Sequence, residues 1–328
     1  VENILRPDEP LPERWPAAGT TGYDFLNVLG GLCVDPAGFR EIIKIYQRYV
    51  GEKVDFAECA YRAKLLILQV AMSSELQMLA HRLNRISEQH RKSRDFTLNR
   101  LRHALREILA CFPVYRTYIG PAGISQRDRR FIHMAVAQAK RRNPAFETSV
   151  FDFIRDTLLL EHPPGIDEAG RRERELFVGR FQQVTSPVTA KGVEDTAFYQ
   201  YVPLVSINEV GGEPRGGTTE REGFHRENLE RLERRAGSLL CTTTHDAKRS
   251  EDVRGRISVL SEIPHLWRAA VNRWTRLNRR FRPEVDGQPA PSRNDEYLFY
   301  QVLVGVWPLE PPTPEGREQI TARLQAYM

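Results

Sequence analysis

Cysteine is scarce in this chain of 328 residues, and the few that occur follow no pattern. The four cysteines are widely scattered, and no two of them form a CxxC pair. This spacing argues against a disulfide scaffold or a zinc module and favours a reducing, cytoplasmic location. We also expect no metal and no cofactor, because HExxH, GxSxG and GxxxxGK[ST] are all missing.

Long apolar runs are missing as well. No stretch approaches the roughly 18–20 apolar residues that cross a bilayer, which excludes an integral membrane protein. The first residues lack the apolar segment of a secretory signal peptide. Hydrophobic residues nevertheless make up 41% of the chain, enough for a core, which excludes a disordered chain. Because the chain begins without methionine and ends without a tail, we expect both ends to be cut.

Positive charge is concentrated in one block. The net charge is +5, but residues 81–143 carry 15 Lys and Arg against 4 Asp and Glu, a local balance of +11 that leaves −6 for the rest. Such a block can bind nucleic-acid phosphates. The basic residues are not interleaved with aromatic ones, and no base-reading motif accompanies them, so we favour the solvated face of helices.

Turn-forming residues dominate the first 35 positions, and helical periodicity follows. We predict a short strand over Val1–Leu5 and then a long loop. From Phe56 to Ser87, apolar residues recur three and four apart, which predicts one long amphipathic helix. Further helices are predicted over 39–49, 97–111, 126–142, 147–160, 169–184, 221–236, 262–281 and 294–305.

Two later runs have the composition of buried strands. Thr185–Ala190 and Leu239–Thr243 are rich in Val, Thr and Leu. A glycine-rich loop and a predicted helix lie between them, a rhythm typical of a parallel sheet or barrel. The predicted fold class is therefore α/β, a partial (β/α)8 TIM barrel with a large all-helical insertion.

The predicted strands carry or lead into charged residues. In a parallel barrel, side chains at the carboxyl ends of strands face the active site. Carboxylates with basic and aromatic companions suit sugar chemistry. Plainer interpretations also apply, such as a structural His–Asp pair or simple surface charge. The residues concerned are Glu2 on the first strand, Lys191, Glu194 and Asp195 after the second, and His245 and Asp246 after the third.

Long motifs spread over the whole chain resemble those of the maltooligosyltrehalose synthase family. This family of the α-amylase superfamily of glycoside hydrolases is also called (1→4)-α-D-glucan 1-α-D-glucosylmutase. The motifs are VENIL with GTTGYDFLN, AKGVEDTAFYQY with SINEVGGEP, TTTHDAKRSEDVRGRISVLSEIP, and SRNDEYLFYQVLVGVWPLEPP.

The resemblance implies an isomerase of trehalose biosynthesis. Its reaction would be an intramolecular transglucosylation that converts the reducing-end α-1,4 linkage of a maltooligosaccharide to an α,α-1,1 linkage, by a retaining mechanism. The implied partners are the maltooligosaccharide and, functionally, a trehalose-releasing hydrolase of the same pathway. Neither nucleic acid nor a membrane is expected as a partner.

The same resemblance assigns roles to individual residues. Glu2 matches the general acid/base on barrel strand five, and Asp246 matches a third carboxylate after strand seven, so both are predicted to be catalytic. The predicted substrate-binding residues are His245, Lys248, Arg249, Lys191, Glu194, Asp195, Tyr23 and Asp24.

The resemblance also sets the expected organisation. Residues 1–35 would form strand five and an active-site loop, 36–183 the helical insertion, 184–261 strands six and seven, and 262–328 a truncated helical segment. The family's nucleophile, an aspartate on strand four, would precede Val1, so the chain alone is expected to be inactive. Asn3 and Ala247 stand where the family pattern has Lys and Thr.

Two other functions stay open at this point. One is an amylase-type or trehalose-releasing hydrolase on the same barrel. The other is a helical module that binds nucleic acid or a protein partner through the basic block at 81–143.

Overall fold

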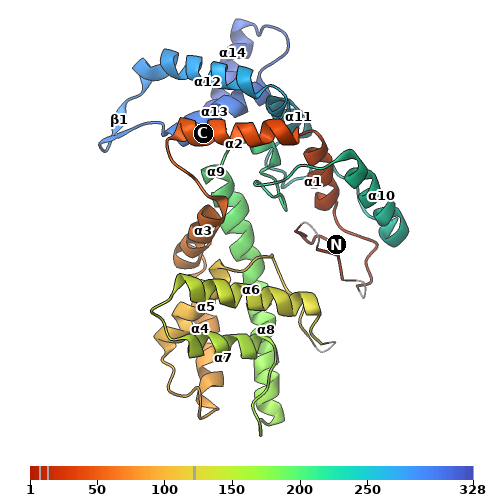
Figure 1. Cartoon of the computed structure of the whole chain (residues 1–328), viewed down its shortest axis with the longest axis vertical. Coiled ribbons are helices and arrows are strands. Elements are labelled where there is room, and N and C mark those ends of the chain that lie inside the picture. Colours follow the sequence, from red (N-terminus) through yellow and green to blue (C-terminus); the bar gives the residue numbers. More distant parts are fainter. Residues whose placement is uncertain (7–8, 13–14, 121–122, 328) are drawn as a thin grey trace. The chain divides into compact units, whose positions relative to one another are not determined.

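The computed structural model describes residues 1–6, 9–12, 15–120 and 123–327, and its regular structure is almost entirely helical (Figure 1). The chain divides into two compact units. Unit 1 consists of Val1–Phe56 and Phe198–Met328, and unit 2 of Ala57–Ala197. None of the described helices is both long and apolar enough to cross a membrane.

Unit 2 is a bundle of helices, three of which have a side-chain cap at their start. The side chains of Thr97, Ser125 and Asp167 each accept a backbone N–H three residues on, which satisfies a donor left free at a helix start. The described elements are α3 (Phe56–Val70), α4 (Ser73–Glu88), α5 (Leu98–Ala110), α6 (Gln126–Arg142), α7 (Thr148–Leu158), α8 (Glu168–Thr189) and the π-helical η1 (Ala190–Ala197).

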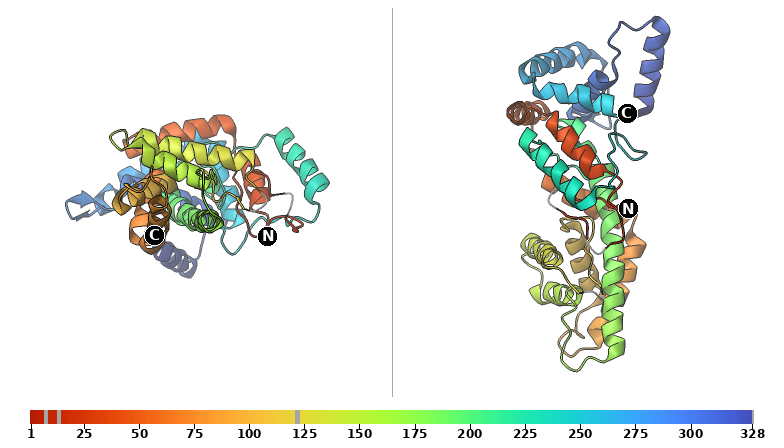
Figure 2. Two further views of the ribbon diagram at one scale, coloured as in Figure 1. Left: turned by 90° about the horizontal axis from the view of Figure 1, so that it is seen from below. Right: turned by 90° about the vertical axis from the view of Figure 1, so that its right-hand side faces the viewer.

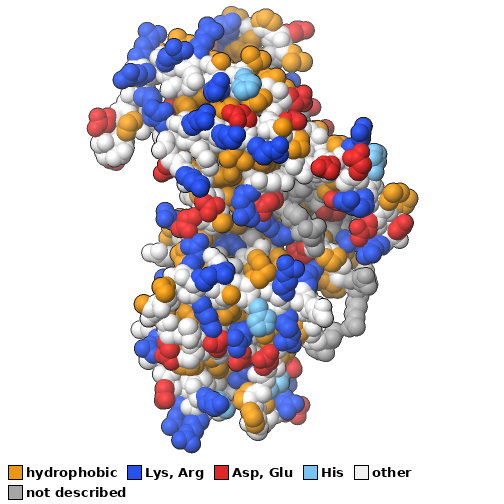
Figure 3. Space-filling view, viewed as in Figure 1, with side chains coloured by type: hydrophobic (Ala, Val, Ile, Leu, Met, Phe, Trp, Pro, Cys, Tyr) orange, Lys and Arg blue, Asp and Glu red, His pale blue; other side chains and the backbone are white. Residues whose placement is uncertain are grey.

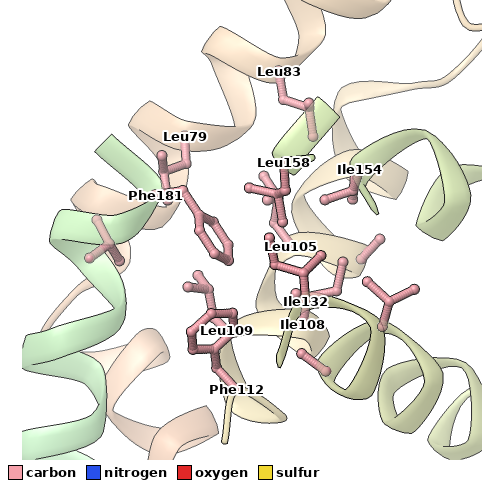
Figure 4. Packing of buried hydrophobic residues seen from close by; sticks show 14 of the residues in the cluster. Leu79, Leu83, Leu105, Ile108, Leu109, Phe112, Ile132, Ile154, Leu158 and Phe181 are labelled. Carbon is pink, nitrogen blue, oxygen red and sulfur yellow. The ribbon is translucent and has the colours of Figure 1, made fainter. Parts of the chain in front are cut away.

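Apolar packing holds unit 2 together. The right-hand view of Figure 2 shows α8 as a long rod, and α4, α5 and α7 contact it. The rings of Phe112 and Phe181 meet edge to face with centroids 5.5 Å apart. Each fully buried aliphatic side chain contributes on the order of 1.5–3 kcal/mol. Figure 4 shows the centre of this core, which includes Leu79, Leu83, Leu105, Ile108, Leu109, Ile132, Ile154 and Leu158.

The predicted helix over Phe56–Ser87 is in fact two helices. Its apolar face is confirmed, since Leu68, Leu76 and Leu83 are all buried in the core. Its continuity is wrong, because α3 ends at Val70 and α4 starts at Ser73. Ser73 and Ser74 are the first two residues of α4, and serine is less favourable in the interior of a helix than near its start.

The predicted strand at Thr185–Ala190 is wrong, because this run continues α8 and enters η1. Phe177, Phe181, Val184 and Val188 are buried at helical spacing, so the apolar face of the helix extends through the run. Burial of that face outweighs the weak strand preference of the β-branched residues.

Unit 1 combines helices with a cluster of aromatic rings. Tyr297 is fully buried, accepts a hydrogen bond from Trp267 Nε1 at 2.8 Å, and packs against Tyr46 and Tyr49. The described elements are α1 (Tyr23–Leu32), α2 (Pro36–Val50), α9 (Phe198–Gln200), η2 (Val205–Ile207), α10 (Arg221–Arg235), α11 (Glu251–Ser258), η3 (Val259–Ser261), α12 (Pro264–Asn278), η4 (Arg279–Phe281), β1 (Glu284–Val285), β2 (Gln288–Pro289), α13 (Arg293–Val306) and α14 (Pro314–Tyr327).

Most of the predicted helices are found close to their expected bounds, but the strands are not. Among the described residues the regular strands are β1 and β2, a two-residue antiparallel pair. Val1–Leu5 and Leu239–Thr243 have no regular secondary structure. A barrel strand exchanges hydrogen bonds with neighbours along its length, and these segments exchange only scattered bonds. The structure therefore does not confirm the partial barrel, and α1 occupies part of the expected long loop.

Buried side chains satisfy the irregular backbone at the centre of unit 1. Every residue of the run Tyr201–Gly212 is buried. Asn208 donates to two carbonyls of the preceding turn at 2.8 Å each. Gln301 accepts from one backbone N–H of the run and donates to one of its carbonyls. Asn27 and Arg249 each donate to a further carbonyl. Since unpaired buried backbone groups are costly, these side chains replace a sheet ladder here.

A close approach within unit 2 provides a stability test. Gly192 lies against α3, and a Cβ at this position would be 2.7 Å from Lys64 Cγ and 3.0 Å from Lys64 N and Cα. We expect Gly192→Ala to lower the free energy of unfolding by about 1–3 kcal/mol, measured by thermal or urea unfolding.

The matched control is Gly179→Ala in α8. A Cβ at Gly179 meets nothing within 4 Å, so this change should be neutral or stabilise by up to about 1 kcal/mol. Equal effects of the two substitutions would show that the contact with Lys64 is unimportant.

Candidate active site

The segment that carries Glu2 is fixed to the irregular run of unit 1. Arg6 donates to Glu213 Oε2 at 2.8 Å and to the Gly212 carbonyl at 3.3 Å. The backbone nitrogen of Val1 donates to the Gly19 carbonyl at 2.8 Å. The segment is thus held at both ends, and Glu2 lies between the two attachments.

The start of α1 lies against the residues that precede His245. Thr20 O accepts the backbone N–H of Leu239 at 3.3 Å. Gly22 has φ +95°, and a Cβ there would lie 2.6 Å from the Leu239 carbonyl oxygen and 2.9 Å from Cys241 N. Only glycine fits this contact without strain. The contact brings Tyr23 next to the loop that carries His245.

Two of the sequence motifs meet as a result. Glu2 Oε1 lies 4.0 Å from His245 Nε2. Tyr23 is 2% exposed, and its hydroxyl accepts a hydrogen bond from Thr244 Oγ1 at 3.2 Å. Thr244 Oγ1 in turn accepts the backbone N–H of Asp246 at 3.2 Å. Burial raises the pKa of Tyr23, and the negative charges of Glu2 and Asp246 raise it further. Both carboxylates therefore act on the same phenol.

A buried carboxylate holds the loop Thr242–Arg249 from the interior of unit 1. Glu209, 1% exposed, accepts the backbone N–H groups of Lys248 and Arg249 at 2.8 Å each. Burial raises the pKa of Glu209, against the opposing effects of these hydrogen bonds and of nearby arginines. The loop is thereby anchored in the interior of unit 1 while its tip stays accessible.

The loop tip and the segment beside it carry exposed groups suited to acid–base catalysis. The side chains of Glu2 and His245 are 56% and 80% exposed. A carboxyl group that exchanges a proton with a substrate, beside a second carboxylate that stabilises positive charge, can break and form glycosidic bonds. Among the described residues, no group of three or more His, Cys, Asp or Glu side chains could hold a metal ion.

Asp24 faces away from this tip. It accepts hydrogen bonds from Thr20 Oγ1 at 2.5 Å and from Arg231 of α10 at 3.2 Å. Arg231 also lies 5.4 Å from the centre of the Phe25 ring. Asp24 therefore joins α1 to α10. Of the two predicted neighbours, Tyr23 lies at the candidate site and Asp24 stabilises the fold.

Known proteins resemble the chain over its full length. It is 30% identical over 331 aligned residues to proteins of two Mycobacterium tuberculosis strains, CDC 1551 and H37Rv, that are assigned as maltooligosyl trehalose synthases. The structure of maltooligosyltrehalose synthase from Arthrobacter ramosus matches 99% of the chain with a TM-score of 0.77 and 32% identity. The chain is homologous to maltooligosyltrehalose synthases along its whole length.

The chain spans only part of these relatives. It covers 38% of each Mycobacterium tuberculosis protein and 37% of the Arthrobacter ramosus maltooligosyltrehalose synthase. The Sulfolobus tokodaii structure, described as a hypothetical maltooligosyl trehalose synthase, matches 98% of the chain with a TM-score of 0.69, 29% identity and 37% coverage of its own length. No protein-family model matches.

Not all the predicted site residues of this synthase homologue come together. Glu2, Tyr23, His245 and Asp246 form the cluster described above. Arg249 has a buried guanidinium that donates to the Val205 carbonyl at 3.2 Å and to a tyrosine hydroxyl of α14 at 3.0 Å. These partners give Arg249 a place in the scaffold. Lys248 contributes its backbone N–H to the loop anchor. Its role as a substrate ligand stays a prediction.

The other predicted substrate-binding residues belong to unit 2. Lys191 and Asp195 form an exposed ion pair at 2.7 Å on η1. Glu194 is 3% exposed and accepts a hydrogen bond from Tyr115. Lys191 and Asp195 are thus exposed on η1, whereas Glu194 is buried. Their binding roles stay predictions.

The sequence interpretation missed Glu209. A signal was present, since Glu209 stands in the long apolar run that precedes the glycine-rich loop. An acid in such a run is buried, and a buried acid needs hydrogen-bond donors. What the sequence could not show is that those donors belong to the loop after His245.

Several side chains of the basic block pair with acidic ones. Figure 3 shows basic and acidic side chains interspersed over the part of the view that contains unit 2. The block's ion pairs include Arg85–Glu173, Arg100–Glu147, Arg129–Glu161, Lys140–Asp152 and Arg142–Glu58. This pairing favours the solvated helical face over the nucleic-acid interface, which stays untested.

The attachment of the Glu2 segment should depend on pH. Burial would raise the pKa of Glu213, but Arg215 and Arg6 outweigh it and hold that pKa below its usual range. A lowered pKa in the folded state stabilises the fold above the unfolded-state value of 4.5, and this contribution is lost as the pH falls through the folded-state pKa. We expect Glu213→Gln to lower the free energy of unfolding by about 1 kcal/mol at pH 7.

The difference between wild type and Glu213→Gln should then shrink as the pH falls below 4.5. Melting temperatures over a pH series measure it. Glu318→Gln, on the exposed side of α14, is the control and should leave stability near wild type. A Glu213→Gln deficit that stays constant down to acid pH would refute the ion-pair explanation.

Proposed function

We propose that this chain carries part of the active site of a maltooligosyltrehalose synthase. The enzyme converts the reducing-end α-1,4 linkage of a maltooligosaccharide into an α,α-1,1 linkage within one molecule. Two facts support the proposal: the whole chain is homologous to these synthases, and Glu2 lies 4.0 Å from His245, the residue before Asp246. The second carries most weight, because it brings two distant motifs to one accessible place.

In the proposed reaction Glu2 acts twice. It first donates a proton to the glycosidic oxygen as the bond from that oxygen to the anomeric carbon breaks and a nucleophilic carboxylate bonds to that carbon. The released glucose then turns, and its own anomeric hydroxyl attacks the same carbon while Glu2 takes its proton. The carboxylate leaves, and the α,α-1,1 linkage forms with retention.

The neighbours of Glu2 have supporting roles in this proposal. Asp246 favours the positively charged, oxocarbenium-like transition state and accepts hydrogen bonds from sugar hydroxyls. His245, beside Glu2, contacts the same sugar. Tyr23 is buried beside this loop, where its hydroxyl accepts the hydrogen bond from Thr244 and helps to hold the loop in place.

The nucleophile has no candidate in this chain. The family resemblance places it on a strand that precedes Val1 in sequence. We therefore propose that activity requires the full-length protein, and the assays below use that protein.

The first test separates isomerisation from hydrolysis. Incubation of the full-length protein with maltopentaose should lower the reducing power without shortening the chain, because a 1,1 linkage ties up the reducing end. A rise in reducing power together with free glucose or shorter chains would instead show an amylase-type hydrolase and overturn the proposal.

The second test removes the proposed catalytic carboxylates. Glu2→Gln should lower kcat about 10²–10⁴-fold, since proton transfer is lost, and Asp246→Asn about 10²–10³-fold, since transition-state charge is less well stabilised. Neither side chain belongs to the packed core described above, so the melting temperature should stay near the wild-type value.

Glu222→Gln on the exposed surface of α10 is the matched control and should have wild-type kcat. Wild-type activity in Glu2→Gln or Asp246→Asn would remove that residue from the mechanism.

A further inference from the structure

We infer that Glu209 and Arg254 are positioning residues that together hold the loop Thr242–Arg249 so that His245 and Asp246 face Glu2. The inference rests on the proposed function for its catalytic consequence. The geometry of the loop anchor stands independently of it.

Glu209 fixes the end of the loop that follows Asp246. Its two carboxylate oxygens each accept one backbone N–H, from Lys248 and from Arg249, at 2.8 Å. Two bonds from one rigid carboxylate to consecutive amides determine the orientation of the chain as well as its position. Because Glu209 is fully buried, water cannot replace these bonds at low cost.

Arg254 holds both ends of the loop at once. Its guanidinium, 6% exposed, donates through one nitrogen to the Arg249 carbonyl and through the other to the Thr242 carbonyl. The planar fork of arginine suits such a bridge, and lysine cannot reproduce it. Arg254 stands on α11, which begins directly after the loop, so the helix and the loop are fixed as one body.

The residues between these attachments are the accessible ones. His245 and Asp246 are exposed, and a local turn orders them, in which Thr244 Oγ1 accepts the Asp246 N–H. Within the described loop, neither side chain forms an ion pair that would fix its direction. The position of His245 beside Glu2, and that of its neighbour Asp246, therefore follow from the anchored ends of the loop. A displacement of about 1 Å at such a site can cost about 10²-fold in rate.

The first experiment measures the loop directly. Hydrogen–deuterium exchange on the full-length protein should show faster exchange of the Lys248 and Arg249 amides in Glu209→Gln and faster exchange across Thr242–Arg249 in Arg254→Lys. Exchange in α12 and α13 should stay as in wild type. Unchanged loop exchange in both variants would overturn the inference, whatever the enzyme does.

The second experiment tests whether the anchor acts through Asp246. With maltopentaose as substrate, Glu209→Gln should lower kcat about 10–100-fold with a smaller change in KM. In an Asp246→Asn background the same change should lower kcat less than threefold. Displacing the loop has little further effect once the Asp246 carboxylate has been removed. Equal losses in both backgrounds would refute a positioning role.

The control is another buried, hydrogen-bonded glutamate. Glu107 of unit 2 is 2% exposed and accepts hydrogen bonds from Tyr61 and Asn143. Glu107→Gln should lower the melting temperature comparably while leaving kcat and loop exchange at wild-type values. An equal loss of kcat in Glu107→Gln would show that instability alone explains the Glu209 effect.

If wild type produces no non-reducing product from maltopentaose, the proposed function fails, and the exchange measurements alone then decide whether Glu209 and Arg254 hold the loop.

Discussion

Unit 1 depends on one constraint: the described run Tyr201–Gly212 is buried without a sheet ladder, so side chains must satisfy its backbone. The run Tyr201–Gly212 lies fully inside the unit, and Asn208, Gln301 and Asn27 supply partners for its N–H and C=O groups. Glu209 stands in the same run, and its carboxylate accepts a backbone N–H of the loop that carries His245 and Asp246. The candidate site is thus the outer end of a polar network whose inner end replaces regular structure.

The two units are stabilised by different means. In unit 2 regular helices satisfy their own backbones, and the core is made of aliphatic and phenylalanine side chains. Such a core depends on volume and shape, and each contact is weakly directional. In unit 1 single hydrogen bonds carry the geometry, and the loss of one partner leaves a buried group unpaired.

Sequence patterns predicted the helices well and the strands poorly. The buried face of α4 follows from a simple spacing rule, and so do the positions of α2, α5 and α6. The strand prediction for Thr185–Ala190 was wrong because it rested on composition. The helical spacing of buried residues that starts at Phe177 and Phe181 continues through this run. Composition describes single residues, whereas the fold followed the longer pattern.

The candidate site was predicted only in part for a related reason. Glu2, His245 and Asp246 could be identified from local motifs, and the structure brings Glu2 and His245 together. Arg249 belongs to the same motif, but its guanidinium turns inward, and Glu209 belongs to a different motif. Whether a polar residue in a motif faces substrate or scaffold depends on contacts distant in sequence, which one motif does not contain.

The π-helical end of α8 has a consequence for the insertion or deletion of residues. In η1 the Thr196 hydroxyl reaches the carbonyl five residues back, while Glu194 points inward and Lys191 and Asp195 point outward. Each residue turns an α-helix by about 100°, so removing one residue from η1 would rotate the side chains that follow by about that angle relative to those that precede. The length of the wide turn therefore determines which side chains of this segment face inward. A single-residue deletion there would be far more disruptive than most substitutions.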